Sequence, residues 1–205
     1  MCYRISRLIF KFLLIALFRV RFLGRENLPE APYILVPNHI SHLDPPLVGI
    51  ADNKHVVDFM AKKELFRPSI LGAWCKSVGC IPVERNGGAT KAMREALHRL
   101  SRGGVIGIFP EGQRSANGDL QEAKRGIGFI IARAKVPVVP VYVGGSGKAL
   151  PKGGKIHPGA KIDVIIGKPI APEEFASLGR ERDYEAISSE VMSHIAGLKE
   201  KWENC

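Results

Sequence analysis

The residues best suited to chemistry lie in segment 38–44, Asn-His-Ile-Ser-His-Leu-Asp. A histidine held by a carboxylate acts as a general base near neutral pH, because the carboxylate fixes the tautomer and stabilises the imidazolium. His39 and Asp44 are five positions apart, which on a regular helix would separate them by about 140°. A catalytic pair therefore requires a turn between them, with Asp44 capping the following helix and His39 outside it.

This base needs a nucleophile from the protein or from the substrate. The Gly-x-Ser-x-Gly sequence that presents a nucleophilic serine is absent. Cys75 and Cys80 lie in apolar stretches that do not indicate an activated thiolate. We therefore predict that the nucleophile is a hydroxyl of the substrate itself.

A second polar cluster, segment 109–115, follows a hydrophobic run. Gly112 permits close approach of a ligand to the backbone, and Glu111 can accept a hydrogen bond from a hydroxyl. Arg114 can hold a phosphate through its planar fork of N–H donors. Arg85, after another apolar strand, is a third candidate anion ligand. The cluster predicts recognition of a phosphorylated substrate.

Spacing alone leaves other interpretations open. Asp44 could simply cap a helix while His39 is hydrogen-bonded in the core. A metal could bind His39, His42 and Asp44, although the other histidines show no complementary paired spacing. Glu111 and Arg114 could form an ion pair in a surface turn.

Apolar segments of strand length alternate with helical patterns along the chain. We predict strands at 33–37, 55–60, 80–84, 105–109, 136–143 and 161–166, and helices at 70–77, 90–101, 124–134 and 184–202, with a further helix opened by Pro45 and Pro46. This alternation predicts an α/β fold, a largely parallel sheet with helices on both faces. Active sites of such folds lie on loops beyond the strand ends.

Composition limits the class of protein. A chain of 205 residues fits one domain, and 45% hydrophobic with 24% charged residues excludes wholesale disorder, collagen and coiled coil. The four cysteines match neither a zinc ribbon nor a compact disulfide framework, so we expect free thiols in a reducing compartment.

The net charge of +10 is concentrated near the start, where residues 1–29 carry +5. Helical periodicity over residues 3–22 predicts a basic amphipathic helix. Its longest uncharged run, 12–18, is far shorter than the roughly 20 residues of a spanning helix. We predict that residues 1–24 form a membrane-surface helix ahead of a catalytic domain at 25–205. An ordinary helix docked on the core is the alternative.

Four motifs occur in order, and together they resemble those of the glycerolipid acyltransferases, in particular the 1-acylglycerol-3-phosphate acyltransferases. They are Asn38, His39 and Asp44; Gly79, Ile81, Val83 and Arg85; Phe109, Pro110, Glu111, Gly112, Arg114 and Ser115; and Val136, Pro137, Val138, Val139 and Pro140. The likeness runs from Asn38 to Val143. Gln113 stands where threonine is usual, and His42 where an aromatic residue is common.

The resemblance implies that His39, oriented by Asp44, deprotonates a lysophosphatidic acid-like acceptor, which attacks the thioester of acyl-coenzyme A or acyl-acyl carrier protein. The product would be phosphatidic acid, an intermediate of phospholipid biosynthesis. The implied substrate-binding residues are Arg85, Glu111, Gly112, Arg114 and Ser115. The reaction would need no metal and no cofactor beyond the acyl donor.

The resemblance and the basic helix together place the protein on the cytoplasmic face of a membrane, as a peripheral or monotopic enzyme beside anionic lipids. Three other functions stay open: an acyltransferase for a different lysolipid, a non-catalytic module that binds anionic lipid, and a metal-dependent hydrolase. Nucleic acid is not an expected partner, because aromatic residues make up only 7% and no single-strand-binding motif occurs.

Overall fold

The computed structural model of this chain describes residues 2–68, 70–84, 89–176 and 183–204. Side chains are described for these residues except those of 2–4, 6, 70, 71, 74, 77, 89 and 176. Arg85, one of the predicted phosphate ligands, lies outside the described residues.

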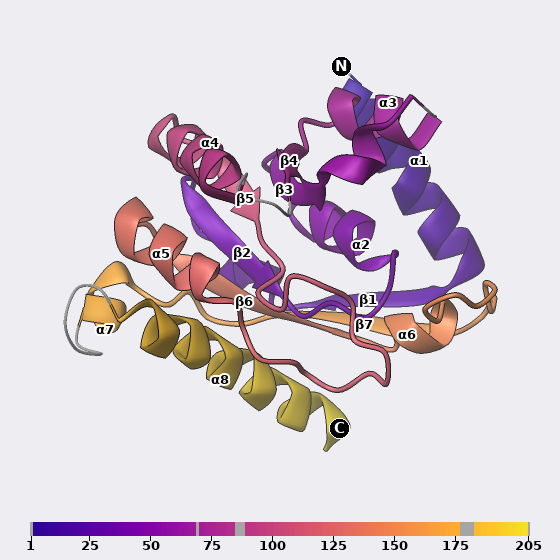
Figure 1. The fold of residues 1–205 in the computed structure, drawn as a ribbon. Coiled ribbons are helices and arrows are strands. Elements are labelled where there is room, and N and C mark those ends of the chain that lie inside the picture. Colours follow the sequence, from indigo (N-terminus) through magenta and orange to yellow (C-terminus); the bar gives the residue numbers. More distant parts are fainter. Residues whose placement is uncertain (1, 69, 85–88, 177–182, 205) are drawn as a thin grey trace.

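A seven-stranded sheet in the order β1-β7-β6-β2-β5-β3-β4 forms the centre of the molecule (Figure 1). Its strands are β1 (Arg19–Leu23), β2 (Tyr33–Pro37), β3 (Val57–Lys62), β4 (Ile81–Val83), β5 (Val105–Gly107), β6 (Val138–Gly144) and β7 (Lys161–Ile166). Neighbouring strands are parallel except β6 and β7, which are antiparallel. The predicted α/β fold with a largely parallel sheet is confirmed, and the six predicted strands are present with ends that differ by up to two residues.

Helices cover both faces of the sheet, as predicted. The helices are α1 (Cys2–Leu17), α2 (Asp44–Ala51), α3 (Ile70–Ser77), α4 (Ala89–Ser101), α5 (Arg125–Ala134), α6 (Ser146–Ala149), α7 (Pro172–Ala176) and α8 (Tyr184–Glu203), with 3-10 turns at Arg25–Asn27 and Lys63–Phe66. Residues of α1, α2 and α6 join one hydrophobic core, and residues of α4, α5, α7 and α8 join the other. Figure 1 shows α2 and α8 on opposite sides of the sheet.

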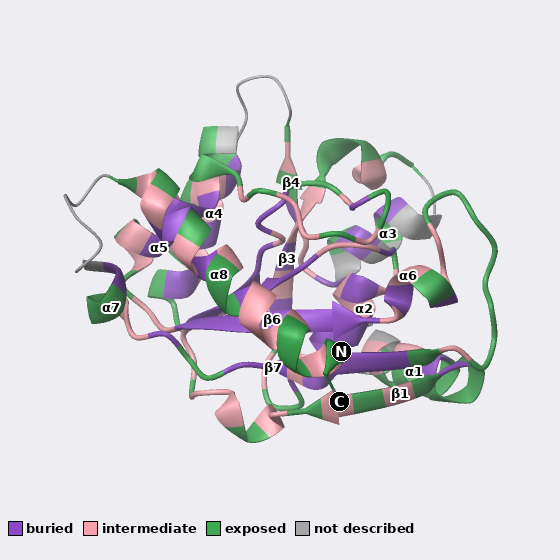
Figure 2. Ribbon diagram, turned by 90° about the horizontal axis from the view of Figure 1, so that it is seen from below, coloured by how far each residue is buried: buried purple, intermediate pink, exposed green. Residues whose placement is uncertain are grey.

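The strand β2 separates the two cores. Its side chains alternate between the faces of the sheet, so that Tyr33 and Leu35 enter the core with α2, while Ile34 and Val36 enter the core with α8. All of β2 is buried, as are the two strands beside it, β5 and β6 (Figure 2). The loop between β2 and α2 therefore begins at a firmly packed strand in the middle of the sheet.

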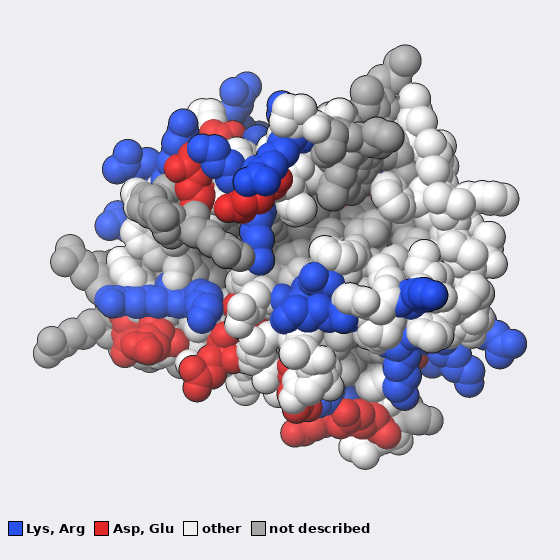
Figure 3. Space-filling model, turned by 45° about the vertical axis from the view of Figure 1, so that its right-hand side comes forward, with Lys and Arg blue, Asp and Glu red and all other residues white. Residues whose placement is uncertain are grey.

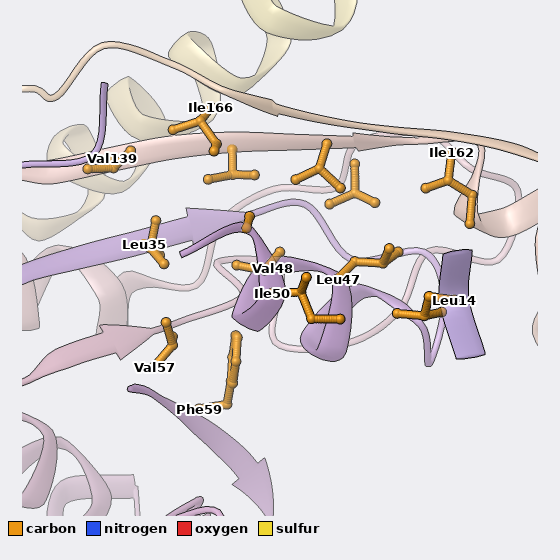
Figure 4. Packing of buried hydrophobic residues seen from close by; sticks show 14 of the residues in the cluster. Leu14, Leu35, Leu47, Val48, Ile50, Val57, Phe59, Val139, Ile162 and Ile166 are labelled. Carbon is orange, nitrogen blue, oxygen red and sulfur yellow. The ribbon is translucent and has the colours of Figure 1, made fainter. Parts of the chain in front are cut away.

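Helix α2 is fixed by the same core. Leu47 and Val48 of α2 are fully buried, and Figure 4 shows Leu47 pointing toward the layer that holds Leu14 of α1 and Ile162 of β7. Large apolar side chains buried in this way each contribute roughly 1.5 to 3 kcal/mol. This packing holds the first residue of α2, Asp44, at the end of the loop that begins at β2.

The opening segment corrects one prediction. The helix expected over residues 3–22 ends at Leu17, and Arg19–Leu23 form β1, which runs parallel to β7. Pairing with β7 satisfies the backbone groups on one side of this edge strand, and Arg21 donates to Asp163 of β7 at 2.6 Å. A non-local strand partner thus outcompetes the local helical pattern over the last part of the segment.

Candidate active site

Asn38 anchors the start of the loop between β2 and α2. Its buried amide accepts from the backbone N–H of Val143 in β6 at 2.7 Å and donates to the carbonyl of Val143 at 3.3 Å. These two hydrogen bonds continue the pairing of β2 with β6 through a side chain. His39, the next residue, is consequently fixed at the carboxyl end of the sheet.

The predicted pair of His39 and Asp44 is formed. Nδ1 of His39 lies 2.9 Å from Oδ2 of Asp44, whose side chain is fully buried. The same oxygen accepts from the backbone N–H groups of Ile40 and Ser41, each at 2.7 Å. A turn at residues 40–43 therefore folds the carboxylate back onto the imidazole.

The prediction that Asp44 caps the following helix is wrong. Asp44 is the first residue of α2, Leu43 precedes the helix at the cap position, and no side chain caps it. The carboxylate accepts from N–H groups that come before the helix instead. A carboxylate that accepts several backbone hydrogen bonds is held in one orientation, which is what a group that must orient an imidazole requires.

The ring of His39 has one nitrogen directed at the carboxylate. Because an ionised carboxylate only accepts hydrogen bonds, a neutral imidazole paired with one donates through Nδ1 and presents the lone pair of Nε2. Within the described residues, no hydrogen bond occupies Nε2, and the side chain of His39 is 16% exposed. One face of the ring stacks on Phe109 with the centroids 4.1 Å apart. The geometry suits a general base that takes a proton through Nε2.

Segment 109–115 lies against His39, but two of its predicted ligands face the protein. Glu111 is 1% exposed, and its Oε1 accepts from the backbone N–H of His39 at 3.0 Å. The backbone N–H of Ser115 donates to the carbonyl of His39 at 2.8 Å. The buried hydroxyl of Ser115 contacts Asn117 and the backbone of Gly118. Glu111 and Ser115 thus hold the backbone of His39 through its N–H and its carbonyl.

Burial raises the pKa of Glu111 to about 7, and the negative charge of Asp44 adds to the increase. Hydrogen bonds from the backbone of His39 and from Gln121 oppose it. A carboxyl group with this pKa changes its charge near neutral pH.

Gly112 and Arg114 are more accessible than Glu111. Gly112 has a φ of 67°, the left-handed region that favours glycine. Arg114 is partly exposed, and its positive charge lowers the pKa of the nearby His42, second to partial burial of that imidazole. Arg114 therefore lies near the loop that carries His39. Asp44 acts electrostatically on Glu111, and Arg114 on His42, although these residues come from two distant segments of the sequence.

In the described ranges, no group of three or more His, Cys, Asp or Glu side chains is arranged to hold a metal ion. Among the helices that the structure describes, none is long and apolar enough to cross a membrane.

A largely parallel sheet carries a histidine-carboxylate pair at its carboxyl edge, with a partly exposed arginine nearby, and this arrangement suits group transfer to a hydroxyl. A family model described as Acyltransferase matches residues 19–144, from the start of β1 to the end of β6. The chain belongs to this family of acyltransferase enzymes, which confirms the resemblance inferred from the motifs.

Individual relatives agree on one activity in their names. The chain is 30% identical over 185 residues to the 1-acyl-sn-glycerol-3-phosphate acyltransferase of Bacillus subtilis, covering 89% of each chain. It is 36% identical over 131 residues to 1-acyl-sn-glycerol-3-phosphate acyltransferase alpha of Ovis aries, covering 61% of this chain and 45% of that relative.

A solved structure supports the fold. The crystal structure of the 1-acyl-sn-glycerophosphate acyltransferase PlsC from Thermotoga maritima matches with a TM-score of 0.72 and 28% sequence identity. The match covers 97% of this chain and 78% of that one.

Sequence reasoning missed three supporting residues. The motif that contains Phe109 predicts no role for this residue, whose ring stacks on both His39 and Phe59. Asn38 also belongs to a motif, but its hydrogen bonds to β6 depend on a strand about a hundred positions away. Gln121, which donates to Glu111, carries no local signal in the sequence.

Proposed function

We propose that this protein transfers a fatty acyl group from acyl-coenzyme A or acyl-acyl carrier protein to the free hydroxyl of 1-acylglycerol-3-phosphate, giving phosphatidic acid for phospholipid biosynthesis. The observation that carries the proposal is the 2.9 Å contact between His39 and the buried carboxylate of Asp44. The names of the relatives supply the acceptor. The acyl donor is a co-substrate, and the proposed chemistry uses no metal or cofactor.

His39 and Asp44 divide the work of proton transfer. Nε2 of His39 takes the proton from the acceptor hydroxyl as its oxygen bonds to the thioester carbonyl carbon. The tetrahedral intermediate then collapses and the carbon–sulfur bond breaks. The leaving thiolate takes up the proton that Nε2 received from the hydroxyl. Asp44 stabilises the imidazolium between these two steps. General-base catalysis of this kind contributes about 10² to 10⁴-fold in rate.

Arg114 is the proposed ligand of the acceptor phosphate, together with Arg85 from beyond β4. A guanidinium can hold two phosphate oxygens through parallel N–H donors. On the face shown in Figure 3, Lys and Arg side chains lie at the left and lower margins of a hollow whose floor carries few charges. Gly112 would let the ligand approach the backbone. Replacing Arg114 with alanine should raise the KM for the acceptor at least about 10-fold, with a smaller effect on kcat.

Helix α1 supplies a surface for the lipid substrates. Leu14 of α1 and Phe18, just beyond the helix, pack into the core, whereas the outward-facing part of α1 exposes Ile5, Leu8, Ile9, Phe12, Leu13, Ile15 and Leu17. The inner side of α1 docks on the core, as in the alternative considered from the sequence. The outer side of α1 is an exposed apolar face. We propose that this face seats the enzyme peripherally at the cytoplasmic surface of a membrane containing anionic lipids.

A thiol-release assay with purified protein tests the activity. We expect thiol release from acyl-coenzyme A or acyl-acyl carrier protein that depends on 1-acylglycerol-3-phosphate and produces phosphatidic acid. A panel of other lysolipids identifies a different acceptor, and EDTA tests for a required metal. Binding to anionic vesicles without thiol release from either donor would favour a non-catalytic lipid-binding module instead.

A further inference from the structure

A closed loop brings Gln121 to the buried side of His39. The backbone N–H of Lys124 donates to the carbonyl of Pro110 at 2.8 Å, so the chain between them returns to its starting point. The loop places Gln121 beside Glu111, ten positions earlier in the sequence. Gln121 is partly buried, belongs to none of the four motifs, and has no role in the proposed reaction.

Four residues then form a continuous hydrogen-bonded relay. Nε2 of Gln113 donates to Oε1 of Gln121 at 3.1 Å, and Nε2 of Gln121 donates to Oε2 of Glu111 at 3.0 Å. Oε1 of Glu111 accepts from the backbone N–H of His39 at 3.0 Å. The relay runs from the exposed Gln113 to the residue that carries the base.

Each link of the relay fixes the orientation of the next. Because Gln113 donates to the amide oxygen of Gln121, the amide nitrogen of Gln121 faces Glu111. When Glu111 is ionised, the reverse orientation would place that oxygen against its carboxylate, an unfavourable contact between two acceptors. Both oxygens of Glu111 accept from groups of the protein, and only 1% of the residue's surface is exposed, so the carboxylate faces the protein and not a substrate hydroxyl.

We propose that Gln121 and Glu111 are positioning residues that hold the backbone of His39, so that Nε2 meets the acceptor hydroxyl at the right distance. Ser115 fixes the carbonyl of His39 on the other side of the same residue. Small displacements of a catalytic group cost large factors in rate, because general-base catalysis needs hydrogen-bond geometry. This inference rests on the proposed function, and it assigns to Glu111 a role other than contact with the acceptor.

An exchange of the two side chains tests the relay. Glu111→Gln alone sets the amide donors of residues 111 and 121 against each other, and Gln121→Glu alone sets two carboxylates together. The double variant Glu111→Gln/Gln121→Glu restores a donor opposite an acceptor at every link, and residue 111 keeps an oxygen for the N–H of His39. We expect each single variant to lower kcat about 2- to 10-fold. The kcat of the double variant should be higher than that of either single variant.

Controls separate positioning from folding and from substrate binding. Glu122→Gln changes an exposed neighbour and should leave kcat unchanged. Thermal melting of each variant reports folding, and Gln113→Leu, at an exposed position, weakens the relay without removing a buried group. The KM for the acceptor should stay within about 2-fold throughout. A raised acceptor KM in Glu111→Gln that persists in the double variant would show that Glu111 contacts substrate and would overturn the proposal.

Amide hydrogen exchange at His39, measured by NMR, keeps this test separate from the activity. We expect faster exchange in Gln121→Met than in the wild-type protein, because the acceptor of the His39 N–H is then less firmly held. This result is expected even if acyl transfer proves absent, which would refute only the proposed function. Unchanged exchange, or a double variant no better than either single variant, would overturn the relay.

Discussion

At the residue scale, His39 is restrained on its ring and on its backbone. Asp44 binds Nδ1, Phe109 stacks on one face of the ring, and Glu111 and Ser115 bind the backbone N–H and carbonyl. None of these contacts involves Nε2, so this side of the ring is left for a substrate. A base held in this way pays little reorganisation at the moment of proton transfer.

Replacing His39 with alanine should lower kcat by about 10² to 10⁴-fold, because the general base is lost. Asp44→Asn should also lower kcat strongly, since an amide can hold the wrong imidazole tautomer and cannot stabilise the imidazolium. Initial rates of thiol release at saturating acceptor measure both effects. His98→Ala, at an exposed position on α4, is the matched control. Near wild-type turnover in His39→Ala would contradict the mechanism.

At the element scale, α1 connects the catalytic core to an exposed apolar surface. Its inner residue Leu14 packs in the core that also holds α2, as does Phe18 just beyond the helix, while Phe12 on the outer side is 74% exposed. Arg7 of α1 also donates to the carbonyls of Asp52 and Asn53 just beyond α2. The helix is thus part of the folded domain on one side and free to meet lipid on the other.

Substituting Phe12 with glutamate should reduce binding to anionic vesicles at least about 10-fold, since burial of a large apolar side chain contributes roughly 1.5 to 3 kcal/mol. Co-sedimentation with vesicles of phosphatidylglycerol and phosphatidylcholine measures the change. Val56→Glu replaces another exposed apolar residue, 47% exposed and outside α1, and should bind like the wild type. Equal loss in both variants would show that α1 is not the specific membrane surface.

At the scale of the whole molecule, the buried Glu111 links stability to pH. Its pKa of about 7 in the folded protein is above the ordinary value of 4.5. At a pH below that ordinary value, the carboxyl is protonated in both the folded and the unfolded protein, so it does not lower the free energy of unfolding. As pH rises from about 4.5 to 7, the unfolded chain ionises first, so the folded state loses relative stability, and the loss levels off above pH 7.

The free energy of unfolding of the wild type should therefore fall relative to that of Glu111→Gln across this pH range. At 1.36 kcal/mol per pKa unit the upper bound is about 3 kcal/mol, and screening by nearby water reduces the expected change to about 2 kcal/mol. Urea denaturation at several pH values from 4.5 to 8 measures the difference. A constant difference between the two proteins would mean that the pKa of Glu111 is not raised.

Much of the architecture was predictable because its signals are local. The buried run at Tyr33–Pro37, the prolines after Asp44 and the apolar periods of the later helices each specify an element within a few residues. The pairing of His39 with Asp44 was also accessible, since a turn between a buried strand and a proline-opened helix brings nearby residues together. The cap role expected for Asp44 failed because the cap depends on backbone dihedrals that the residue type alone does not set.

Residue type, spacing and periodicity thus determined the pairing of His39 with Asp44 and the α/β alternation that positions it. The tertiary structure alone decided the rest: β1 forms only because β7, some 140 positions later, offers a free edge, although the alternation of arginine with apolar residues at 19–22 was its faint local sign. The contact of Glu111 with His39 likewise spans 72 positions. Such pairings depend on which elements become neighbours in the sheet, and a local stretch of sequence carries no record of its distant partners.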